Sequence, residues 1–98
     1  MKIEFEWSNR VSPNQFCREF IQRMLNRVIV GYYRHGDMGT ANTRGKDVPG
    51  MLEARWKKYK GTGNTELLID VANLAMSEFM NPSHPKAHFH PEDSGGHR

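Results

Sequence analysis

The sequence contains a single cysteine, which excludes an intramolecular disulfide. Secreted domains of this size commonly depend on disulfides, so one cysteine in 98 residues is typical of a protein of a reducing cytoplasm. Cys17 falls among apolar residues at helical spacing. We therefore expect it to pack on the inner side of a helix rather than to act as a nucleophile.

Long apolar runs are also missing. No stretch reaches the roughly 18 to 20 apolar residues that a membrane-spanning helix needs. The opening residues, MKIEFEW, carry two acids and no apolar region of the kind that a signal peptide has. The sequence therefore predicts a cytoplasmic protein with no membrane partner.

Neither sign of charge is in large excess. The formal net charge of +3 is compatible with an anionic partner but does not indicate one. The basic residues form no recognisable DNA- or RNA-binding motif, so nucleic acid is not the expected partner. A length of 98 residues, 37% of them hydrophobic, allows one domain with a small core.

Hydrophobic spacing predicts three helices. The first runs from Pro13 to about Arg34, after a capping box that begins at Ser12. The second begins near Pro49 and ends at Gly61, which would be its C-cap. The third follows a cap at residue 64 and ends before the two prolines of NPSHP. It is apolar over most of its circumference, which is typical of a central helix or of one in an oligomer.

The two ends of the chain differ from the helices. The opening KIEFEW alternates apolar and charged residues as a β-strand does, and could pair with its copy in a second subunit. Residues 81–98 show no periodicity, and we expect this histidine-rich tail to lie across the helices and bury Phe89. The expected fold is a mainly α, oligomeric small domain: one possible strand and three helices over 1–80, and an extended tail over 81–98.

The third predicted helix carries a narrow polar ribbon. At 100° per residue its members fall within an arc of about 60°. They are Glu66, Asp70, Asn73 and Ser77. Buried carboxylates need partners. Three interpretations stay open: a thin exposed stripe, a structural pairing with Arg27 or Arg55, or the wall of a ligand pocket.

The pocket interpretation predicts a binding protein for a small anionic ligand such as a nucleotide signal. Arginine would meet phosphate, an aromatic ring would stack on a base, and Asn73 would read a base edge or ribose. No catalytic residue and no cofactor is expected, and the protein is more plausibly a binder than an enzyme. The predicted ligand-binding residues are Arg44, Arg55, Tyr59, Glu66, Asp70, Asn73, His88 and His90.

A metal site is not expected, although histidines gather near the end of the chain. Structural zinc takes four ligands, and no cysteine lies nearby to help. His88 and His90 would point to opposite sides of an extended segment. We expect the histidines to line a groove or to face water.

A longer pattern covers roughly residues 55–94, with the wording RWKKYKGTGNTELLIDVANLAMSEFMNPSHPKAHFHPEDS. It resembles a group of small proteins from phages and bacterial mobile elements. The resemblance implies a phage or prophage setting in the host cytoplasm, and no activity. Small phage proteins often act stoichiometrically, for example by blocking or sequestering parts of host defence. A protein-interaction module that blocks a host target is therefore the alternative to the nucleotide binder.

A second resemblance concerns the segment ELLIDVANLA. It is similar to the last metal-binding helix of all-α nucleotide pyrophosphohydrolases of the MazG type, which present glutamates and aspartates to magnesium. This would imply a magnesium-dependent hydrolase. The family pattern is E-x-x-E or E-x-x-D, whereas the spacing here is E-x-x-x-D, and the other predicted helices offer only Glu19 and Glu53.

Overall fold

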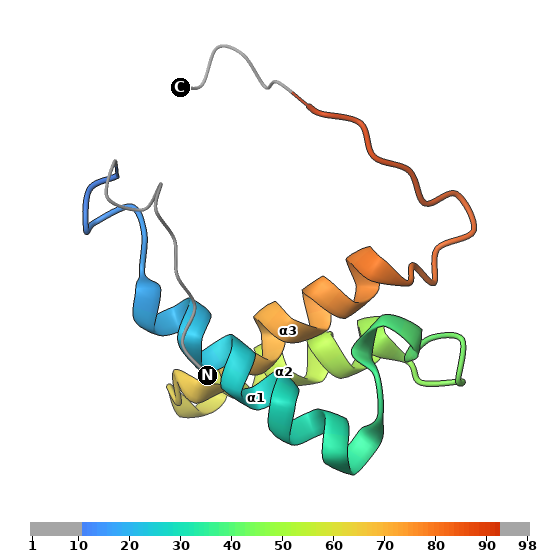
Figure 1. Cartoon of the computed structure of the whole chain (residues 1–98), viewed down its shortest axis with the longest axis horizontal. Coiled ribbons are helices and arrows are strands. Elements are labelled where there is room, and N and C mark those ends of the chain that lie inside the picture. Colours follow the sequence, from blue (N-terminus) through green and yellow to red (C-terminus); the bar gives the residue numbers. More distant parts are fainter. Residues whose placement is uncertain (1–10, 93–98) are drawn as a thin grey trace.

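Residues 11–92 are described in the computed structural model of the chain, and they form three α-helices and one short 3₁₀ turn (Figure 1). The elements are α1 (Arg18–His35), η2 (Met38–Thr40), α2 (Val48–Thr62) and α3 (Glu66–Met80). The prediction of a mainly α, three-helix domain is confirmed. The predicted strand falls on residues 2–7, outside the described range. No helix within that range is long and apolar enough to cross a membrane.

The first helix begins later than the sequence predicts, at Arg18 instead of Pro13. The Oγ of Ser12 accepts a hydrogen bond from Asn14 N at 3.1 Å, and Gln15 N donates to Ser12 O at 2.8 Å. Serine thus closes a short turn with its own neighbours, a use that competes with capping a helix. The predicted capping box is wrong for this physical reason.

Cys17 occupies the N-cap of α1. Its Sγ accepts a hydrogen bond from Phe20 N at 3.4 Å, and the residue is exposed. The prediction that Cys17 packs on the inner side of a helix is therefore wrong, because the helix starts one residue after it.

An aspartate and a glycine cap the two ends of α2. Asp47 is its N-cap and accepts a hydrogen bond from Gly50 N at 3.1 Å. The helix closes at Gly63, whose φ of 74° is left-handed and whose N–H donates to Tyr59 O at 2.8 Å. The predicted C-cap, Gly61, remains inside the helix.

The central element is α3, which packs against α1, α2 and η2. Figure 1 shows α1 crossing α3 and α2 running beside it. The prediction of a central third helix is confirmed. The buried core between α3 and its neighbours contains few residues, and some of them are polar. The buried residues are Val48, Leu67, Ile69, Asn73, Leu74 and Ser77.

The side of α3 that faces the body is the side that carries the polar ribbon. Buried Asn73 and Ser77 belong to the ribbon, and the buried apolar residues flank it. The opposite side is apolar, and its residues fall within an arc of about 60°. We call it the outer face of α3: Leu68, Ala72, Ala75 and Phe79. Ala75 is exposed and Phe79 is 73% exposed. The helix therefore buries a polar ribbon between apolar core residues, and its outer face, which is polar in an ordinary surface helix, is apolar as well.

The described part of the tail, residues 81–92, extends away from the helices (Figure 1). Phe89 is 79% exposed, so the prediction that it is buried across the helices is wrong. Beyond Ser83, the hydrogen bonds of the described tail are local: Lys86 N donates to His84 Nδ1 at 3.0 Å, and Ala87 N donates to His84 O at 3.1 Å. Prolines at 82, 85 and 91 favour such an extended course.

Candidate functional site

In the N-terminal half of the polar ribbon, Glu66 and Asp70 are bound by one arginine of α1. Arg27 Nη1 lies 3.1 Å from Glu66 Oε1, and its Nη2 lies 3.1 Å from Asp70 Oδ1. Arg55 Nε of α2 lies 3.9 Å from Asp70 Oδ2. Asp70 is only 18% exposed, so its charge needs these cations. This geometry supports the structural pairing that the sequence left as one of three interpretations.

In the C-terminal half of the ribbon, Asn73 and Ser77 donate hydrogen bonds to backbone carbonyls. Asn73 Nδ2 donates to Met24 O of α1 at 3.1 Å, and Ser77 Oγ donates to Met38 O of η2 at 2.5 Å. Asn73 Oδ1 is buried and has no hydrogen-bond partner among the described residues. With its amide turned into the contact between α1 and α3, Asn73 does not present a base-reading edge to solvent.

Arg44 serves its own loop. Its Nε donates to Thr40 Oγ1 at 3.0 Å, its Nη1 to His35 O at 2.8 Å, and its Nη2 to Asp37 O at 2.6 Å. These bonds satisfy carbonyls at the end of α1 and in the loop that follows. The guanidinium predicted to meet a phosphate is therefore engaged in closing the loop between α1 and α2.

A second set of polar contacts ties that loop to the end of α3. Asn42 Nδ2 donates to Glu78 Oε1 at 2.8 Å and to Asn81 O at 2.6 Å, and Asn42 Oδ1 accepts from Val48 N at 3.3 Å. Glu78 Oε2 accepts from Ser83 N at 2.7 Å and from Ser83 Oγ at 2.8 Å. We call this set the Asn42–Glu78 clamp. It fixes the point at which the tail leaves α3.

The clamp changes the acidity of Glu78. The backbone N–H of Ser83, the amide of Asn42 and the hydroxyl of Ser83 all donate to the ionised carboxylate, and His84 adds a favourable charge. Together they hold the pKa of Glu78 below its ordinary value, against a smaller opposing effect of desolvation. The sequence analysis did not identify this cluster. The proline after Asn81 predicts only that α3 ends there.

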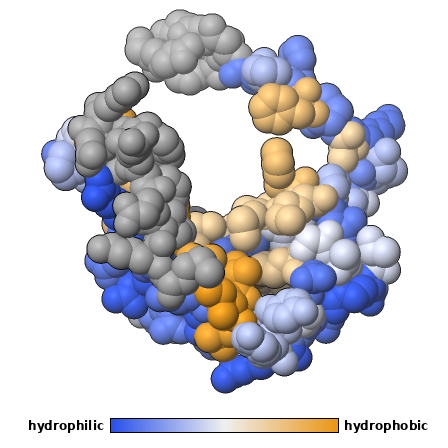
Figure 2. Space-filling view, viewed as in Figure 1, coloured by the Kyte–Doolittle hydropathy of each residue, from blue (hydrophilic) through white to orange (hydrophobic). Residues whose placement is uncertain are grey.

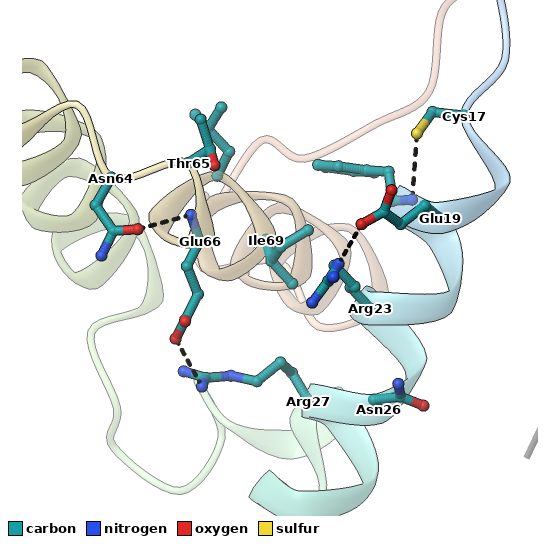
Figure 3. A pocket seen from close by; sticks show the side chains of 11 residues that line it. Cys17, Glu19, Arg23, Asn26, Arg27, Asn64, Thr65, Glu66 and Ile69 are labelled. Atoms are coloured by element: carbon teal, nitrogen blue, oxygen red, sulfur yellow. Dashed lines mark hydrogen bonds and ion pairs between the residues drawn. The ribbon is translucent and has the colours of Figure 1, made fainter. Parts of the chain in front are cut away.

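A groove of about 550 Å³ lies between the first turns of α1 and the beginning of α3 (Figure 3). Arg23 and Arg27 enter it from α1, each joined to a carboxylate: Arg23 Nε to Glu19 at 2.8 Å and Arg27 to Glu66. Leu68 belongs to its apolar part. The charges in the groove are thus two cations and two anions, and its size suits a small ligand.

The predicted ligand-binding residues do not share this groove, since Glu66 alone among them lines it. Arg55 joins Asp70, while Tyr59 stacks on Trp56 along α2 with ring centroids 5.6 Å apart. The remaining predicted residues are placed elsewhere: Asn73 within the helix contact, Arg44 in its loop, and His88 and His90 exposed on the tail. Sequence reasoning missed Arg23, which the Glu19 four residues earlier could have marked as a helix-surface pair.

Metal ligands do not gather in residues 11–92: no group of three or more histidine, cysteine, aspartate or glutamate side chains is close enough to hold an ion. The two carboxylates behind the MazG resemblance, Glu66 and Asp70, face the guanidinium of Arg27.

Comparison with known proteins gave no match, whether to a family model, to a curated protein or to a solved structure.

Proposed function

We propose that this protein is a protein-interaction module that binds other protein surfaces through the outer face of α3. The observation that supports the proposal is the outer face of α3, which is apolar although the helix already buries its polar ribbon and the apolar residues that flank it. A helix of a small domain would ordinarily turn polar residues to its outer side. Here the outer side is apolar and is left for a partner.

The most exposed large residue on this side is Phe79, which is 73% exposed. Figure 2 shows apolar side chains gathered along the middle of the molecule, where α3 runs. Burying one side chain of this size releases roughly 1.5 to 3 kcal/mol. Contiguous apolar surface of this kind is characteristic of binding sites, and the phage-like sequence pattern predicts a host protein as one target.

A pair of matched substitutions tests the proposal. Ala75→Glu places a charge on the outer face of α3, and Ala54→Glu places the same charge on an exposed position of α2. Both keep good helix formers on exposed helix surface, so both should fold. Immobilised wild-type protein and Ala54→Glu should retain one stoichiometric protein from host extract, and Ala75→Glu should lose it. Retention of the same protein by all three would contradict the proposal.

A second candidate function is the capture of a small anionic ligand such as a nucleotide signal, with an anti-defence role by sequestration. The groove between α1 and α3 favours it, because Arg23 and Arg27 both line it. Their carboxylate partners Glu19 and Glu66 are mostly exposed, and such pairs contribute only about 0.2 to 1 kcal/mol. A phosphate could therefore displace them at small cost.

Calorimetry against a panel of nucleotides tests this second candidate. Binding should be lost in Arg23→Ala and kept in Lys58→Ala, which removes an exposed cation of α2. Absence of heat with every nucleotide, or equal binding by the two variants, would rule out the groove as a nucleotide site.

A further inference from the structure

We infer that the outer face of α3 binds a second copy of this chain, with the two α3 helices antiparallel across a two-fold axis. The inference rests on the proposed function, because it assigns an occupant to the same face, and a host protein would compete with the second copy for that face. It names the partner from the pattern of residue sizes, from the placement of charges, and from the course of the tail.

The sizes of the outer-face residues read the same in both directions. Leu68, Ala72, Ala75 and Phe79 follow a spacing of four, three and four, with large residues at the ends and alanines in the middle. A two-fold axis requires that if one residue meets another, the reverse contact also forms. Around an axis between the alanines, Ala72 meets Ala75 of the second copy, and Leu68 meets Phe79.

The antiparallel arrangement suits these residues better than the parallel one. Two alanine layers in the centre let the helix axes approach closely, and each end then holds one leucine and one phenylalanine. A parallel pair would place both copies of Phe79 at one end and both copies of Leu68 at the other. The distance between the two helix axes would then differ from one end to the other. The spacing itself is that of a coiled-coil seam, and antiparallel helix dipoles attract.

The carboxylates of α3 are all turned away from the outer face. Glu66 and Asp70 point to Arg27 on α1, and Glu78 points to Asn42 in the loop. Because each acid is bound by a partner within its own chain, two copies can meet along α3 without bringing like charges together. A contact between two uncharged faces therefore adds no local charge repulsion to that of the whole chains, whose net charge is +3.

The tail supplies the third argument. It leaves the C-terminal end of α3 and keeps Phe89 79% exposed, and Figure 2 shows open space between it and the helices. In an antiparallel pair this end lies beside the beginning of the other α3, where Phe20 and Leu68 line the groove. Residues 81–89 can span roughly 30 Å when extended. Phe89 can therefore enter the groove of the second copy.

Light scattering after size-exclusion chromatography tests the pairing. Wild-type protein and Ala54→Glu should have about twice the chain mass of 11.3 kDa, and Ala75→Glu should have the chain mass itself. Circular dichroism should show equal helix content in all three, so that loss of the pair is separated from loss of the fold. Phe89→Ala should still fold but should dissociate at higher concentration than wild type, by tenfold or more. A monomeric wild type at every concentration would overturn the inference.

Cysteine cross-linking tests the orientation. In a Cys17→Ser background, Ala72→Cys and Ala75→Cys variants are mixed and oxidised. Antiparallel pairing should yield chiefly the disulfide between the two different variants, because a disulfide needs Cα atoms within about 7 Å. Disulfides that join each variant to itself would show parallel pairing and overturn the antiparallel axis.

The two proposals can fail separately. A wild type that is monomeric yet captures a host protein, with capture lost in Ala75→Glu, would overturn the pairing and leave the interaction module standing. A wild type that neither pairs nor captures a protein would overturn both.

Discussion

Arg27 of α1 lies with Nη2 3.1 Å from Oδ1 and 3.4 Å from Oδ2 of Asp70 on α3. This contact joins two helices whose residues are 43 positions apart in the sequence. It also fixes the rotation of α3 about its own axis, because the carboxylate must face α1. The outer face of α3 is apolar and open as a direct result of that rotation.

Loss of Arg27 should destabilise the fold. Arg27→Ala leaves Asp70, which is 18% exposed, without its nearest cation, and we expect a loss of about 1 to 3 kcal/mol in the free energy of unfolding. Arg23→Ala on the same helix removes an exposed pair with Glu19 and should change it by less than about 1 kcal/mol. Urea unfolding of both variants measures the difference. Equal losses would show that the contact with Asp70 has no special structural role.

Substitutions of Asn73 distinguish a structural role of the polar ribbon from a ligand-binding role. Its Oδ1 is buried without a hydrogen-bond partner, so Asn73→Leu removes an unsatisfied atom while keeping a similar volume. We expect this variant to lie within about 1 kcal/mol of wild type. Asn73→Asp should destabilise by roughly 2 to 3 kcal/mol, because it sets a carboxylate against Met24 O in a buried contact.

Thermal unfolding in the absence of any ligand measures both variants. A stable Asn73→Leu protein that loses binding to a nucleotide would contradict the structural role and revive the pocket interpretation.

Much of the helical order could be predicted because it depends on local pattern. The end of α3 follows from prolines that cannot continue a helix, and its central place follows from its apolar circumference. The start of α1 could not be predicted in this way, since Ser12 can either cap a helix or close a short turn, and only the folded chain selects between the two. Gly61 and Gly63 are two residues apart, and either could have closed α2.

The candidate site was harder to predict, for a different reason. The ribbon's need for partners can be read from α3 alone, but the choice of Arg27 over other cations depends on a contact between distant segments. Arg44 in a glycine-rich loop looks suited to phosphate, and only the backbone course shows that three nearby acceptors engage it. A helix that is apolar nearly all round also gives no sign of which side is outermost.

Acid should weaken the Asn42–Glu78 clamp. The folded pKa of Glu78 is held below its ordinary value of 4.5, first by the backbone N–H of Ser83. Stability from this group is therefore fully present above pH 4.5 and is lost as the pH falls through the lower, folded pKa. Glu78→Gln should be less stable than wild type at neutral pH, and the difference should shrink below pH 4.5.

Unfolding midpoints measured in urea across the acid range give the two profiles. Glu53→Gln, which removes an exposed carboxylate of α2, is the control and should follow the wild-type profile. A constant difference between Glu78→Gln and wild type at all pH values would contradict a contribution from the ionised carboxylate.

Two glycines should respond to alanine in opposite directions. Gly36 has a φ of 82°, and an added Cβ would lie 3.3 Å from Arg44 Nη1, so Gly36→Ala should lower the free energy of unfolding by about 1 kcal/mol or more. Gly61 is helical and an added Cβ meets nothing within 4 Å, so Gly61→Ala should raise it by roughly 0.5 to 1 kcal/mol. Both variants keep the side chains of the groove and of the outer face of α3. Unfolding in urea should therefore separate them while light scattering finds the same mass, and a gain in stability for Gly36→Ala would show that the loop does not need this backbone conformation.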